Sequence, residues 1–244
     1  MEDRVSTSLP FLYNRLGPVT QGIVTAMCGR FTLYSSVSNL KKVFDIDTVT
    51  CEMEASYNIA PGNEIYAIIR GQDNRLGKLH WGLVPPWAKD LSGASGLINA
   101  RAETLQEKPS FRKAFKERRC LIPADGFYEW REKQPWYCTP ATGTLFGFAG
   151  LWETWKGKDQ SVYHSCTIIT TEASESVKGI HDRMPVIFKP EVIKEWLDPA
   201  NKNYDNLNMI LEQGRVTEVK TYPVAKLVDS PRNNDPRCIK PVSD

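Results

Sequence analysis

The sequence lacks the residue patterns that mark structural zinc sites and common cofactor sites. Its six cysteines are widely spaced with no C-x-x-C pair, and its three histidines form no H-E-x-x-H pair. It also has no P-loop, no G-x-G-x-x-G and no G-x-S-x-G. Zinc sites, nucleotide-phosphate loops and hydrolase nucleophile elbows each depend on one of these motifs. We therefore expect no metal and no cofactor.

Long apolar runs and a secretory leader are absent too. No apolar run reaches the roughly 18 residues that a membrane helix needs. The first 26 residues contain no apolar stretch followed by a cleavage site. A disulfide framework is not expected in a chain of 244 residues without such a leader. These absences predict a cytoplasmic protein, nucleoid-associated if bacterial, that does not bind membranes.

The charge balance excludes a strongly basic protein. The chain has 31 basic and 29 acidic residues, which gives a formal net charge of +2. With 41% hydrophobic and 25% charged residues it has the composition of an ordinary globular protein. Any contact with nucleic acid must therefore come from a local basic patch, since the overall charge does not provide it.

Residues 1–26 differ from the rest because they are polar and show no sustained period. We interpret them as a disordered or non-native extension and residues 27–244 as one domain. Strand patterns outnumber helical ones, which favours an α+β domain over a doubly wound parallel sheet. Helices are expected after Ser36, Pro109 and Pro190 and from Tyr204 to Gly214, and strands over 64–70, 77–81, 120–123, 127–131, 145–152, 162–170, 185–188 and 216–222.

Cys28 stands directly after Met27. If translation starts at Met27, or if a leader is removed up to it, Cys28 becomes the N-terminal residue. A terminal cysteine carries an α-amine of pKa about 8 and a thiol of pKa about 8.5. The amine can form an imine with an aldehyde, and the thiol can then close a five-membered ring on the imine carbon. The ordinary alternative is a small buried cysteine without chemistry.

Three further polar residues are candidates for chemistry. Glu129 lies among three aromatic residues, and desolvation there would raise its pKa and suit it to general acid/base catalysis. His181 titrates in the same range, and the Asn99 amide could orient reacting groups. Each also has a purely structural interpretation: a turn asparagine, an exposed carboxylate on a strand and a loop histidine.

The segment 81–87 places Trp81 and Trp87 on either side of Pro85-Pro86. This pattern is typical of core or lid aromatics, or of a rigid wedge or stacking platform for bases. Arginines interleaved with aromatic residues would suit the backbone of a single strand. The basic residues considered for this purpose are Arg30, Arg101, Arg112, Lys113, Arg118, Arg119 and Arg183.

Six motifs together resemble the SRAP (SOS response-associated peptidase) family, which has bacterial and human members. They are M-C-G-R-F at 27–31, Y-N-I-A-P-G at 57–62, W-G-L-V-P-P-W at 81–87, I-N-A-R-A-E-T at 98–104, I-P-A-D-G-F-Y-E-W at 122–130 and H-D-R-M-P at 181–185. They keep the family's order and extend the resemblance from Met27 to about Val242. The resemblance implies a single compact α+β domain with a β-barrel-like core, a few peripheral helices and a positively charged DNA groove.

The resemblance also implies a function. A member of this family is expected to sense abasic sites in single-stranded DNA covalently, as part of the DNA damage and SOS responses. It forms a thiazolidine DNA–protein crosslink through N-terminal Cys28, and autopeptidase (hydrolase) and lyase-like activities are expected with it. Asn99 would orient the reacting groups, Glu129 would shuttle protons, and His181 would assist opening of the deoxyribose ring. The implied partner is single-stranded DNA containing abasic sites, bound by a monomer.

The DNA-binding positions carried over from the family are Arg30, Asn58, Trp81, Arg101 and Arg183. Trp81 lies near the family's wedge, but Gly82 stands where the family has a second wedge aromatic. The residues before Met27 also depart from the family pattern, because the chemistry needs a free α-amine. We expect translation to begin at Met27, with self-cleavage as the second route. Two other functions stay open: a thiol autopeptidase or protease, and a non-covalent reader of single-stranded or modified DNA.

Overall fold

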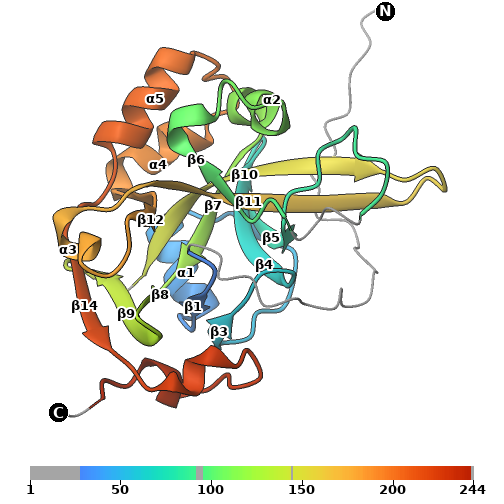
Figure 1. Cartoon of the computed structure of the whole chain (residues 1–244). Coiled ribbons are helices and arrows are strands. Elements are labelled where there is room, and N and C mark those ends of the chain that lie inside the picture. Colours follow the sequence, from blue (N-terminus) through green and yellow to red (C-terminus); the bar gives the residue numbers. More distant parts are fainter. Residues whose placement is uncertain (1–27, 92–95, 144, 243–244) are drawn as a thin grey trace, which may run out of the picture.

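The computed structural model describes residues 28–91, 96–143 and 145–242, so the predicted N-terminal extension lies outside the described residues (Figure 1). Its centre is a ring of five strands, each hydrogen-bonded to the next. In ring order they are β4 (Glu64–Arg70), β5 (Asn74–Trp81), β11 (Val162–Glu172), β10 (Phe146–Lys156) and β7 (Arg119–Ala124). The parallel β5–β11 pairing closes the ring, whereas the other pairs are antiparallel. This confirms the predicted α+β domain with a barrel-like core.

A second sheet packs beside the ring and carries part of the candidate site. Its order is β14 (Val219–Pro223), β9 (Gln134–Pro140), β8 (Gly126–Arg131), β1 (Phe31–Leu33) and β3 (Ser56–Ile59). The chain passes from β7 to β8 through the buried Asp125, whose carboxylate accepts hydrogen bonds from the backbone of Tyr34 and Ser35. The short strands β2 (Thr48–Val49), β6 (Asn99–Arg101), β12 (Arg183–Pro185) and β13 (Ile187–Phe188) extend the ring sheet.

The helices lie at the edges of the two sheets. They are α1 (Val37–Phe44), α2 (Pro109–Glu117), α3 (Glu175–Lys178), α4 (Pro190–Leu197) and α5 (Tyr204–Gln213), with the 3₁₀ turns η1 (Ala102–Thr104), η2 (Lys226–Asp229) and η3 (Pro236–Ile239). Figure 1 shows α2, α4 and α5 together at one end of the barrel. The predicted caps are confirmed: Ser36 accepts from Asn39, Pro109 and Pro190 occupy first turns, and Gly214 ends α5.

Eight predicted strands are present, with shifted ends. The strand expected at 185–188 is split in two, because β12 pairs with β11 whereas β13 pairs with β10. β14 begins at Val219, three residues later than the predicted 216. Five strands were not predicted: β1, β2, β3 and β6 are short, and β9 contains prolines at 135 and 140 that argue against a strand.

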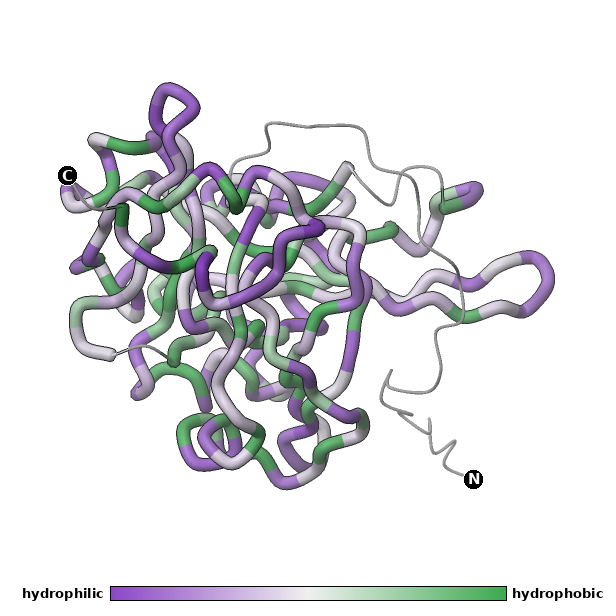
Figure 2. The backbone as a smooth tube through the Cα atoms, turned by 90° about the horizontal axis from the view of Figure 1, so that it is seen from below, coloured by the Kyte–Doolittle hydropathy of each residue, from purple (hydrophilic) through white to green (hydrophobic). Residues whose placement is uncertain are grey.

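Three apolar clusters hold these elements together. The largest fills the ring, and a second, with Tyr128 and Val228, lies between β8, β9 and the C-terminal residues. The third joins Val84, in the loop after β5, to Trp155 and Tyr163 on the hairpin of β10 and β11. This hairpin projects from the body as an arm, and its tip is hydrophilic (Figures 1 and 2). Trp155 and Tyr163 face each other across the arm, one residue pair from its tip.

Candidate active site

Cys28 and Glu129 meet where β1 lies beside β8. The antiparallel register pairs Phe31 with Phe127, and the Tyr128 N–H donates to the Arg30 carbonyl at 2.9 Å. Extending this register brings the start of the described chain to Glu129. The backbone N–H of Cys28 donates to Oε1 of Glu129 at 2.7 Å. Cys28 has a φ of 47°, in the left-handed region that non-glycine residues seldom adopt.

Both side chains are removed from water. Cys28 is 4% exposed and Glu129 is 2% exposed. Burial raises the pKa of Glu129, although contacts with Cys28 and the charge of His181 oppose the rise. Burial, and then the Glu129 charge, raise the pKa of the Cys28 thiol well above its usual range, while Arg183 acts in the opposite sense. The thiol is therefore neutral at rest, beside a carboxyl group that burial makes easier to protonate.

His181 lies in the loop between α3 and β12. Its backbone N–H donates to the Val177 carbonyl at 3.1 Å, and its Nδ1 accepts from the backbone N–H of Arg183 at 3.0 Å. A neutral imidazole that accepts at Nδ1 carries its proton on Nε2. In its protonated form, His181 would lower the pKa of the nearby Glu129 carboxyl. The structure thus brings His181, Glu129 and Cys28 into one neighbourhood.

Asn99 and Arg101 lie on β6, which runs parallel to β11. The register places Asn99 opposite Ile168 and Arg101 opposite Thr170. Thr170 is also where Arg183 docks, because the Arg183 Nη2 donates to the Thr170 carbonyl at 2.8 Å. Arg101 is exposed at this edge. β6 and β12 therefore flank β11 on opposite sides, and the Arg183 side chain links the two sides through Thr170 and Glu103.

Arg183 is paired with a residue that the sequence interpretation overlooked. Its Nη1 and Nη2 donate to the two carboxylate oxygens of Glu103 at 2.9 and 3.0 Å. Such a two-pronged pair fixes the plane of the guanidinium group. Glu103 lies in the same I-N-A-R-A-E-T motif as Asn99, so its motif membership was the available signal.

Arg30 and Asn58, both predicted to bind DNA, hold the C-terminal part of the chain. Arg30 Nη1 donates to Asn58 Oδ1 and to the Val228 carbonyl, each at 2.7 Å, and its guanidinium lies over the ring of Trp130. Asn58 Nδ2 donates to the carbonyls of residues 228, 230 and 233. We call residues 226–239 the C-terminal strap. With Asn58 only 4% exposed, the structure gives its side chain an internal role.

The two tryptophans of the segment 81–87 differ in position. Trp81, the last residue of β5, is 0% exposed, packs edge-on against Phe31 and donates from Nε1 to the Ile98 carbonyl at 2.9 Å. The prediction that Trp81 contacts DNA is therefore wrong for this structure, because the barrel core covers its ring. Trp87, at the other end of the motif, is 57% exposed.

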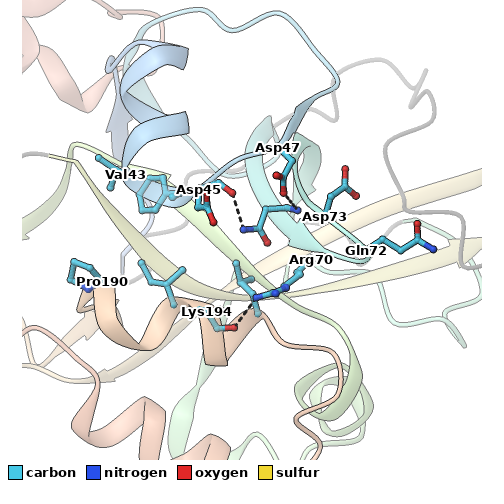
Figure 3. A pocket seen from close by; sticks show the side chains of 12 residues that line it. Val43, Asp45, Asp47, Arg70, Gln72, Asp73, Pro190 and Lys194 are labelled. Carbon is cyan, nitrogen blue, oxygen red and sulfur yellow. Dashed lines mark hydrogen bonds between the residues drawn. The ribbon is translucent and has the colours of Figure 1, made fainter.

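A cavity elsewhere in the molecule takes no part in this arrangement. Figure 3 shows a pocket of about 220 Å³ between α1, the β4–β5 turn and α4, with Asp45, Asp47, Arg70 and Lys194 on its wall. None of the predicted site residues lines it. Within the described ranges, no group of three or more His, Cys, Asp or Glu side chains could hold a metal ion. No described helix is long and apolar enough to cross a membrane.

Comparison with known families settles the relationship of the chain. The profile of the SOS response associated peptidase (SRAP) family matches residues 27–231. The chain belongs to the SRAP family. It is 48% identical over 222 residues to the abasic site processing protein YoqW of Bacillus subtilis (strain 168), covering 88% of this chain and 99% of that protein.

Two further comparisons give more distant likenesses. The abasic site processing protein HMCES of Xenopus tropicalis is 32% identical over 192 residues, which are 67% of this chain and 56% of HMCES. A crystal structure of a protein from Bacteroides thetaiotaomicron has the same fold, with a TM-score of 0.77 at 24% identity, covering 88% of this chain and 100% of that one. This last likeness concerns the fold alone.

Proposed function

We propose that this SRAP protein forms a covalent crosslink with abasic sites in single-stranded DNA through the amine and thiol of Cys28. The main support for the proposal is the hydrogen bond between the Cys28 nitrogen and Glu129. It places a buried carboxyl group next to the atom that must react. The names of the relatives, abasic site processing proteins, support the same substrate.

The proposed reaction uses residues of this chain alone. The free amine of Cys28 adds to the aldehyde of the ring-opened deoxyribose, and loss of water gives an imine. The Cys28 sulfur then bonds to the imine carbon, and its proton passes to the nitrogen, giving a thiazolidine. Glu129 takes and returns these protons because its pKa is raised by burial. The imine also acidifies the adjacent sugar C–H, which accounts for the expected lyase-like activity.

The remaining residues position the sugar and the strand. His181 delivers a proton during ring opening, and Asn99 orients the reacting groups from β6. Arg101, exposed at the same edge, holds a phosphate. Arg183 keeps a positive charge near Cys28, and its pair with Glu103 fixes the position of the guanidinium group.

The same contact favours a second activity, removal of the residues before Cys28. The Cys28 thiol would attack the Met27 carbonyl, and the bond from that carbon to the Cys28 nitrogen would break. The nitrogen would leave with a proton from Glu129, and water would hydrolyse the resulting thioester, freeing the thiol and the amine. This autopeptidase step would prepare the crosslinking form.

The deciding experiment is incubation with an abasic single-stranded oligonucleotide, followed by denaturing electrophoresis and intact mass measurement. We expect an adduct that survives denaturation in the protein beginning at Cys28. Cys28→Ala should give no stable adduct, whereas borohydride should still trap its reversible imine on the α-amine. Tight binding without any trapped species would instead indicate a non-covalent reader.

A further inference from the structure

The exposed Trp87 sits at the corner of a stiff turn. The Ala88 N–H donates to the Pro85 carbonyl at 3.0 Å, which closes a turn with Trp87 at its third position. Pro85 and Pro86 each fix their own φ and so restrict the turn further. An exposed indole is usually mobile and costs conformational entropy when it binds. Here the backbone beneath it is already ordered.

The turn is fastened to the arm formed by β10 and β11. Trp155, on β10, donates from Nε1 to the Ala88 carbonyl at 2.8 Å, immediately after Trp87. Ser165, on β11, accepts from the Val84 N–H at 2.8 Å on the other side of the turn. The Trp155 ring packs with Val84 and Tyr163 in the small cluster at this place. Two hydrogen bonds and an apolar contact thus attach the turn at Pro85–Ala88 to the arm.

We propose that Trp155 is a positioning residue that holds Trp87 as a preformed stacking surface for a nucleobase of single-stranded DNA. The inference rests on the proposed function, since it assumes that this face meets DNA. Stacking of bases on aromatic side chains tolerates any sequence, which suits a protein that reacts wherever a base is missing. The role of Trp155 is indirect: its bond to Ala88 sets the direction in which the neighbouring Trp87 points.

The test is a double-mutant cycle on affinity for an undamaged oligo-dT strand. Trp155→Phe keeps an aromatic ring in the cluster but removes the donor to Ala88. We expect it to weaken binding about fivefold, the worth of one net hydrogen bond. In the Trp87→Ala background the same substitution should have no further effect, because the residue that it positions is gone. An equal loss in both backgrounds, or no loss in either, would overturn the inference.

A spectroscopic signature separates positioning from loss of fold. In protein labelled with 5-fluorotryptophan, the ¹⁹F resonance of Trp87 is assigned by its absence in Trp87→Phe. We expect that resonance to shift or broaden in Trp155→Phe without DNA. The matched control is Trp196→Phe, which removes another Nε1–H bond to a carbonyl, that of Cys120 at 2.9 Å, away from this turn. A Trp87 signal unchanged by Trp155→Phe would contradict the inference.

The wild-type protein separates this inference from the proposed function. Binding of oligo-dT without any adduct on an abasic strand would contradict the crosslinking function, and the cycle would still decide the role of Trp155. An adduct on the abasic strand, together with no coupling between Trp155→Phe and Trp87→Ala in the double-mutant cycle, would contradict only the positioning role of Trp155. Failure of the wild type to bind oligo-dT would overturn the role of Trp155 directly.

Discussion

The backbone nitrogen of Cys28 and the carboxylate of Glu129 are joined at 2.7 Å, although 101 residues of sequence separate them. While residues precede Cys28, that nitrogen is an amide and the contact only ties the chain to β8. Once it is freed, the same position holds an amine beside a buried carboxyl group. Under the proposed function, a single cleavage would convert this structural hydrogen bond into a contact between the nucleophile and its proton carrier.

The first prediction concerns the terminus. Crosslinking to an abasic strand should require a protein that begins at Cys28, because an imine needs a free amine. Intact mass and adduct yield should be measured on protein starting at Cys28 and on full chain blocked from processing. Equal rates for both proteins would refute the requirement.

The second prediction separates the proton carriers. Glu129→Gln keeps the shape and a hydrogen-bond acceptor but does not titrate, so adduct formation should slow by roughly 10²–10⁴-fold. His181→Ala should slow it less if ring opening is shared with Glu129. Time courses of adduct formation decide between them. If Glu129→Gln matched the wild type while His181→Ala was inactive, the roles would be reversed.

The third prediction concerns the groove. Arg101 is exposed on β6, so Arg101→Ala should weaken binding of single-stranded DNA at low salt. It should also reduce the slope of log affinity against log salt by about one unit, as loss of one phosphate contact does. Titrations at several salt concentrations measure both quantities. An unchanged affinity and slope would remove Arg101 from the DNA contacts.

The fourth prediction treats Asn58 as a structural residue. Asn58→Ala removes three bonds to carbonyls of the C-terminal strap, so the free energy of unfolding should fall by about 1–3 kcal/mol. The salt slope of DNA binding should stay that of the wild type. Denaturant unfolding and the same salt titration check the two outcomes. A lowered slope with unchanged stability would restore the DNA contact predicted from the sequence.

The fifth prediction is a pH dependence of stability in the full chain. A glutamate in the unfolded chain titrates near about 4.3, and burial raises the pKa of Glu129 above that value. The stabilisation of the folded chain that comes from the raised pKa of Glu129 is complete at pH values below the unfolded-state pKa. It is lost as pH rises through the folded-state pKa. As pH rises from the unfolded-state pKa through the folded-state pKa of Glu129, the free energy of unfolding of the wild type should therefore fall relative to that of Glu129→Gln. Urea unfolding at stepped pH measures the difference, and a constant difference would contradict it.

The sequence was sufficient for the features that depend on local pattern. A short apolar run predicted β4, the one predicted strand whose two ends were both correct, and the capping residue Ser36 predicted the start of α1. The aromatic neighbours of Glu129 predicted its desolvation, which its burial confirms. These signals lie within a few residues of the feature that they predict.

Features that depend on residues far away in the sequence could not be predicted. Nothing near Asn58 indicates that residues about 170 positions later take up its amide group. Trp81 and Trp87 share one motif, and only the closing of the ring decides which of them is covered. Cys138, on β9, gave no signal either. The diagonal β8–β9 pairing sets it beside Glu129, and burial followed by the Glu129 charge raises the pKa of its thiol.

The C-terminal strap has a consequence for the timing of synthesis. Arg30, two residues from Cys28, is held by the carbonyl of Val228, and the adjoining strap residue Asp229 accepts from the indole of Trp130, next to Glu129. A nascent chain on the ribosome lacks these partners until almost all of the domain has been made. Cys28 and Glu129 therefore reach their final arrangement only near the end of translation. If Cys28 reacts as proposed, an incomplete polypeptide would not yet present it to cellular aldehydes.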